Sequence, residues 1–145
     1  MQQTAEIVYL PRAPLVACEC EWPGDHGRPF HFHVYPKNTS FIRAEAVFVF
    51  ASRIGQTMRF APLYVGQTSD LRAVMTDLVE MADIWVGAEE LGFDTVHVHY
   101  EHSEHRRRSI RSELLRSLNP VLNRDIRGAD IPPQAVTGAI PGVVW

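Results

Sequence analysis

The stretch PLYVGQTSDLR, residues 62–72, places a tyrosine in a short apolar run that leads to the start of a helix. Tyr64 lies in the apolar run. Thr68 or Ser69 can cap a helix, and Asp70 suits its first turn because a negative charge complements the helix dipole. A phenolic hydroxyl can donate or accept a hydrogen bond, and it can attack an electrophile once deprotonated. Tyr64 is therefore the first candidate catalytic residue.

Cysteines and histidines near the N-terminus have the ligand types of a zinc site. The candidate ligands are Cys18, Cys20, His31 and His33. Alternation along the two runs places both cysteines on the face of Trp22 and both histidines on the opposite face. We therefore expect no metal site here, and instead cross-strand pairs between these histidines and Glu19 and Glu21.

An arginine-rich run, HRRR at residues 105–108, could contact phosphate groups, although a charge run at a helix start is usually a solvated face. The net charge is −3, from 14 Lys and Arg against 17 Asp and Glu, whereas nucleic-acid-binding domains are usually basic. The charge balance disfavours DNA as a partner. No signal peptide and no apolar run of membrane-spanning length is visible, so we expect a soluble, cytoplasmic protein with no membrane partner.

The hydrophobic pattern predicts strands and two long helices in a single domain, residues 1–145. Strands are expected at 16–22, 30–35, 46–51, 63–65 and 95–100, the first two forming an N-terminal β-hairpin over residues 16–35. Helices are expected from Ser69 to about Val86 and from Ser103 to Leu118. The first helix should bury Leu71, Val74, Met75, Leu78, Ala82 and Trp85. His97 and His99 should occupy ordinary half-exposed positions, and residues 124–145 form a Pro/Gly-rich C-terminal tail.

With its elements in this order, the chain resembles the GIY-YIG nuclease superfamily over residues 34–123. AVF, residues 46–48, stands in place of the first triplet and YVG, residues 64–66, in place of the second. Pro120 and Asn123 match the closing Pro-x-x-Asn element, and Gly66 ends the second triplet. The resemblance implies an α+β fold with a small, mostly antiparallel central sheet flanked by helices.

The resemblance also implies a mechanism. A tyrosine or its bound water attacks a phosphodiester, a glutamate holds one divalent cation, and an arginine stabilises charge on the phosphate. Of these positions only Tyr64 keeps its residue type. The first-motif tyrosine falls on Phe48, the arginine on Val74 and the glutamate on Arg111, which replaces a metal ligand with a cation.

We therefore expect a domain that has lost phosphodiester cleavage, needs no cofactor, and acts as a binding module for a protein or an anionic ligand. Candidate anion-binding residues are Arg72, Arg107, Arg108 and Arg111. The alternative is a metal-dependent DNA endonuclease with a rearranged site, built from Tyr64, Arg72, Glu104 and a histidine and requiring Mg²⁺. A third hypothesis is a nucleic-acid binder without chemistry, using Arg106, Arg107, Arg108, Arg111 and Arg116.

Two further expectations concern single residues. Arg111 falls in the apolar stripe of the second helix and should point toward the sheet on the Tyr64 side, since an unpaired buried charge costs several kcal/mol. Either this charge pairs or snorkels at the exposed end of the helix, or it belongs to an anion-binding pocket. Trp145 should dock on its own domain or on a second copy, which leaves a homo-oligomer open.

Overall fold

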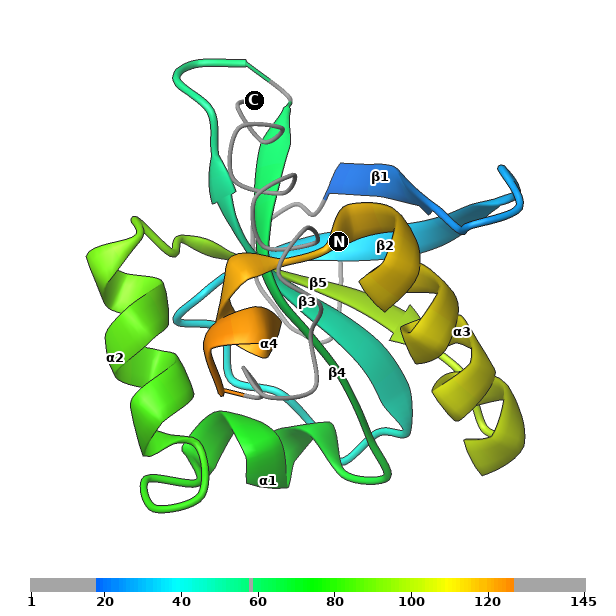
Figure 1. The fold of residues 1–145 in the computed structure, drawn as a ribbon. Coiled ribbons are helices and arrows are strands. Elements are labelled where there is room, and N and C mark those ends of the chain that lie inside the picture. The colour runs from blue at the N-terminus through cyan, green and yellow to red at the C-terminus, as the bar shows by residue number, and fades with distance from the viewer. Residues whose placement is uncertain (1–17, 58, 127–145) are drawn as a thin grey trace.

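The computed structural model describes residues 18–57 and 59–126, which form one five-stranded antiparallel sheet with helices around it (Figure 1). Its elements in chain order are β1 (Cys18–Pro23), β2 (Pro29–Pro36), β3 (Ala46–Arg53), β4 (Phe60–Thr68), α1 (Leu71–Thr76), α2 (Ala82–Glu90), β5 (Thr95–Tyr100), α3 (Glu104–Leu118) and α4 (Val121–Ile126). The strand order is β1-β2-β5-β3-β4, and every neighbouring pair is antiparallel. The predicted α+β class with an antiparallel sheet is confirmed.

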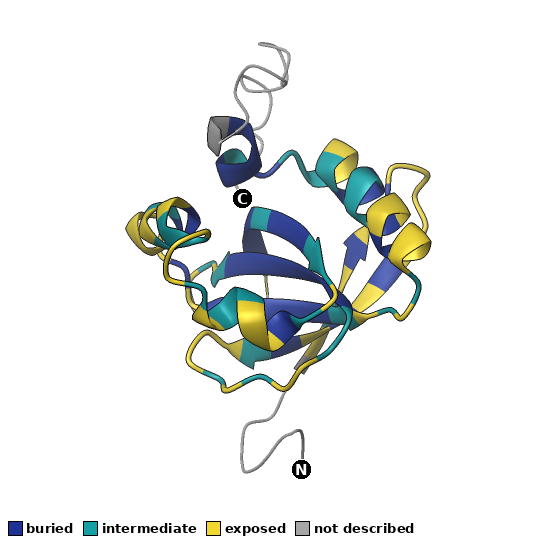
Figure 2. Ribbon diagram, turned by 90° about the horizontal axis from the view of Figure 1, so that it is seen from below, coloured by how far each residue is buried: buried dark blue, intermediate teal, exposed yellow. Residues whose placement is uncertain are grey.

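Strand β3 is an interior strand with both faces in the apolar core, as its sequence AVFVFA predicts. Its residues from Ala46 to Ala51 are all buried, because β5 pairs with one edge and β4 with the other. Val47 and Val49 face α3, while Phe48 and Phe50 face α1, α2 and α4. The sheet therefore separates two cores, with α2 and α3 on opposite sides of it (Figure 2).

Strands β1 and β2 pair so that Trp22 lies opposite Phe30, with both side chains buried in the core under α3. On the other face, Glu21 lies opposite His31, and the carboxylate and imidazole are 3.2 Å apart. The expected cross-strand pair is thus present at Glu21 and His31.

The prediction of one long helix from Ser69 to Val86 is wrong. The N-cap is Asp70, whose carboxylate accepts a hydrogen bond from the Ala73 N–H, and α1 ends after six residues. Asp77 ends it, because its carboxylate accepts hydrogen bonds from the backbone N–H groups of the next turn and competes with helix continuation. Leu78 lies in that turn and is 80 % exposed, so its predicted burial is also wrong.

The second helix follows its prediction closely. Ser103 caps α3 by accepting a hydrogen bond from the Arg106 N–H, and α3 ends at Leu118. Asn119 then adopts a left-handed conformation, which asparagine tolerates better than most residues. This turn sends the chain into α4, which contacts both β4 and α2.

The predictions for the start of the hairpin before residue 18, for the tail beyond residue 126 and for docking of Trp145 lie outside the described residues. Among the described helices, none has the combination of length and apolar character required to span a bilayer.

Candidate functional site

Tyr64 lies half-buried on β4, opposite Phe50 on β3, on the sheet face covered by α1, α2 and α4. Its ring centroid is 5.8 Å from that of Phe50 and 6.1 Å from that of Phe48, both of which are buried. Gly66 lies opposite Phe48, and a Cβ atom there would come within 2.5 Å of the Phe48 ring. Gly66 is therefore required for packing of this aromatic cluster.

The other matched positions surround this cluster or lie on α3. Val74, on α1, packs against the core that contains Tyr64 and Phe48. Arg111 is half-buried on α3, whose apolar residues pack against the opposite face of the sheet. Proximity of Arg111 to Tyr64 stays a prediction.

Asn123 fixes α4 to the outer edge of β4. Its side-chain oxygen accepts a hydrogen bond of 2.8 Å from the Val65 N–H, and its side-chain nitrogen donates one of 2.9 Å to the Val65 carbonyl. The carboxamide thereby satisfies the backbone of an edge strand as a neighbouring strand would. Asn123 and Pro120 are both buried, so these motif residues have an evident structural role.

Arg107 is the most deeply buried cation of α3, with 3 % of its surface exposed. Its guanidinium donates to the Gln67 side chain at 3.0 Å and to the carbonyls of Glu101 and His102 at 3.2 and 2.8 Å. The Glu45 carboxylate lies 4.0 Å away. The sequence pattern pointed to Arg111 as the buried charge. The deeply buried arginine of α3 is instead Arg107, whose hydrogen bonds link α3 to β4 and to the loop after β5.

The neighbouring arginines are engaged with carboxylates. Arg106 lies 3.3 Å from Glu101, and the hydrogen bonds that Glu101 accepts from the Ser103 N–H and from Arg106 hold its pKa below the usual value. Arg108 lies 2.7 Å from Glu104. These two candidate phosphate contacts are therefore partly neutralised within the domain.

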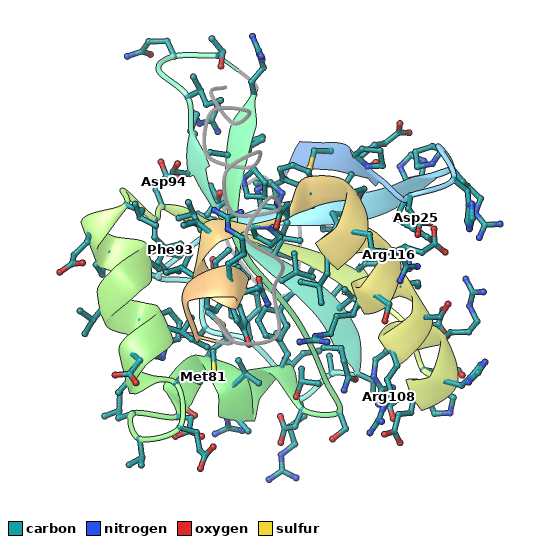
Figure 3. All side chains as sticks on the ribbon, in the orientation of Figure 1. Asp25, Met81, Phe93, Asp94, Arg108 and Arg116 are labelled. Atoms are coloured by element: carbon teal, nitrogen blue, oxygen red, sulfur yellow. The ribbon has the colours of Figure 1, made fainter. Side chains whose placement is uncertain are left out.

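Farther along α3, Arg116 pairs with Asp25 in the turn between β1 and β2, where Figure 3 labels both. This hydrogen-bonded pair lowers the pKa of Asp25. Arg72 is exposed on α1, whereas the other candidates lie on α3.

His97 is the main site residue that sequence reasoning missed, because the expectation of half-exposure is wrong. It is 0 % exposed, and its Nδ1 lies 3.0 Å from the Trp22 Nε1 and 3.1 Å from the Cys20 Sγ. The indole N–H can only donate, so Nδ1 must accept and the proton of a neutral ring sits on Nε2. That nitrogen lies 3.1 Å from the Thr95 hydroxyl.

Burial, with a further contribution from the positive charge of Arg53, lowers the pKa of His97 to about 3. His97 is therefore neutral at physiological pH. With its only free lone pair already engaged by Trp22, the imidazole is poorly placed to take a proton from the Cys20 thiol. The cluster is a buried polar network that links β1 to β5.

Glu113 is a second polar group whose burial the sequence did not indicate. It is buried on α3 against the backbone of Gly24, which leaves no room for a Cβ at that glycine, and Arg28 lies 4.0 Å from its carboxylate. The apolar periodicity of α3 gave no signal for it, because Glu113 contacts a turn rather than the sheet.

Within residues 18–57 and 59–126, no three His, Cys, Asp or Glu side chains are grouped as a metal site would need. Comparison of the chain with protein-family models, with curated proteins and with solved structures found no match.

Proposed function

We propose that this chain is a GIY-YIG-like domain that does not cleave phosphodiester bonds and instead binds a partner protein. The family likeness rests on the two motif strands. AVF lies on the interior strand β3, and YVG lies beside it on the edge strand β4, so that Phe48 is opposite Gly66 and Phe50 opposite Tyr64. Asn123 binds the backbone of Val65 within the second triplet.

The main observation in support of the proposed loss of cleavage is the packing of Phe48. At the matched position of the first-motif tyrosine, this chain places a ring with no hydroxyl, buried between Gly66, Phe50 and Tyr64. Val74 and Arg111 likewise supply neither a phosphate-binding cation nor a metal-binding carboxylate at their matched positions. On this proposal the first-motif hydroxyl, the phosphate-binding cation and the metal-binding carboxylate are all absent from their matched positions, and only Tyr64 is retained.

Ion pairing on α3 favours a protein over nucleic acid as the partner. Affinity for a phosphate backbone comes from cations that displace counterions. Arg106 and Arg108 are already paired with carboxylates, and Arg107 is buried. The rearranged endonuclease is disfavoured by the same contacts, since Glu104, its candidate metal ligand, is engaged with Arg108 at 2.7 Å.

A nicking assay on supercoiled plasmid tests this proposal. Purified protein, Tyr64→Phe and the control Tyr100→Phe are incubated with Mg²⁺, with Mn²⁺ and with EDTA. We expect no metal-dependent product from any of the three proteins. Nicking that depends on metal, is lost in Tyr64→Phe and persists in Tyr100→Phe would show that the rearranged site is active.

A further inference from the structure

The outer surface of α2 and the turn before it, residues 77–91, exposes large apolar side chains. Leu78 and Val79 are 80 % and 83 % exposed, Val86 is 59 % exposed, and Leu91 is also exposed. The turn leads directly into the helix, because the Ala82 N–H donates to the Val79 carbonyl. Val79 lies in this turn, and Val86 lies on the helix itself. We call this surface the α2 outer face.

Carboxylates surround these apolar side chains. The acidic residues of the α2 outer face are Asp77, Glu80, Asp83, Glu89 and Glu90, and no lysine or arginine occurs in the sequence between Arg72 and Arg106. Side chains ending in oxygen project from the outer side of α2 at the left of Figure 3. Among the described residues, Glu80, Asp83 and Glu90 make no ion pair.

The domain itself shows how a cation meets this face. Lys37, from the segment after β2, places its ammonium 2.8 and 2.9 Å from the two carboxylate oxygens of Glu89. An approaching chain with further lysines or arginines could pair with the carboxylates of Glu80, Asp83 and Glu90. Its apolar side chains would cover Leu78, Val79 and Val86, which are otherwise exposed to water.

We propose that the α2 outer face is the partner-binding surface and that it binds a basic amphipathic helix of another protein. This inference rests on the proposed function. Apolar residues spaced three and four apart on that helix would cover Leu78, Val79 and Val86, and flanking cations would meet the carboxylates. A second copy of this chain fits worse, because a two-fold interface would bring the same carboxylates together. The segment 127–145 also fits worse, since it carries one arginine and one aspartate.

Binding of synthetic peptides to the full chain tests this proposal by fluorescence anisotropy. The probe is an 18-residue labelled peptide with leucines at helical spacing and lysines elsewhere. One matched peptide has glutamate in place of lysine, and a second has the lysine peptide's composition in shuffled order. We expect the amphipathic lysine peptide to bind at least about tenfold more tightly than either, and more weakly as salt rises.

Variants of exposed residues locate the binding surface. Val79→Ser with Val86→Ser, and separately Asp83→Lys with Glu90→Lys, should each weaken binding of the lysine peptide about tenfold. Ile42→Ser, at a residue 63 % exposed outside this face, should leave binding unchanged. All four positions on the α2 outer face are exposed, so the variants should keep the wild-type melting temperature.

Any of these results would overturn the proposal: equal binding of the three peptides, equal loss of binding in Ile42→Ser, or a dimer that the valine variant dissociates. Tighter peptide binding after deletion of residues 127–145 would assign the face to that segment and would overturn it as well. None of these results bears on cleavage, so failure here leaves the nicking assay to judge the proposed function separately.

Discussion

Replacing His97 should flatten the dependence of stability on pH. In the folded chain the pKa of His97 is about 3, whereas an unfolded histidine has a pKa of about 6.5. Below the higher value the unfolded chain takes up a proton that the folded chain excludes. Stability is therefore complete above about pH 6.5 and is lost progressively as the pH falls toward 3.

The size of the effect follows from these two values. Each pH unit below 6.5 costs roughly 1.4 kcal/mol of stability, so at about pH 4 the loss from this one residue is roughly 3 kcal/mol. That is a large part of the ~5–15 kcal/mol by which a domain is stable. Protonation would also place a second N–H at Nδ1, facing the indole N–H of Trp22 at 3.0 Å.

Urea unfolding followed by circular dichroism, between about pH 7.5 and pH 4, measures this effect. His97→Gln should lose roughly 3 kcal/mol less stability than the wild type over that range, while His105→Gln, at an exposed position, should follow the wild type. Carboxylates such as Asp25, whose pKa is also lowered, affect all three proteins equally.

Parallel pH dependences for His97→Gln and the wild type would refute the reasoning. If the glutamine variant fails to fold, NMR titration of the wild-type imidazole decides the matter, because the ring should stay neutral down to about pH 4. A midpoint near pH 6 in the titration of His97 would contradict the lowering of its pKa that we attribute to burial.

Three other substitutions test how the helices are held. Asn123→Ala should lower the free energy of unfolding by roughly 2–4 kcal/mol, because the N–H and the carbonyl of Val65 both lose their partner; an effect below about 1 kcal/mol would show that water replaces the amide. Arg107→Met should cost roughly 3 kcal/mol in urea unfolding, since a glutamine and two backbone carbonyls lose a buried donor, and an unchanged midpoint would contradict this role. Gly87→Val should lower the melting temperature, because a Cβ there lies 2.7 Å from a methyl of Leu122; Leu122→Ala in the same chain should recover part of the loss, and strict additivity would argue against the contact.

Strand positions and the course of α3 could be predicted because they depend on local patterns. Alternation marked β2 and β5, an apolar run marked β3, and Ser103 and Asn119 marked the ends of α3. The break between α1 and α2 was missed because an apolar periodicity continues across it. Asp77 decides that break through hydrogen bonds of its own side chain, which a hydrophobic pattern does not register.

Buried polar groups were harder to predict, since their burial depends on which elements meet. The sequence TVHVHY gives His97 and His99 the same local pattern, yet only His97 is enclosed, by Trp22 from β1 and Phe60 from β4. On α3, Arg107 is buried rather than Arg111 because acceptors from Gln67 and the loop after β5 converge on it. No spacing along one helix could have indicated acceptors from other elements.

The most direct test of the central claim is a single-turnover cleavage measurement, with the protein in excess over end-labelled duplex and single-stranded DNA in Mg²⁺ or Mn²⁺. We expect every substrate to remain intact at the level of the EDTA control, because under the proposed GIY-YIG likeness Phe48, Val74 and Arg111 supply none of the groups that cleavage would require. Metal-dependent product formed by the wild type and abolished by Tyr64→Phe would contradict the claim.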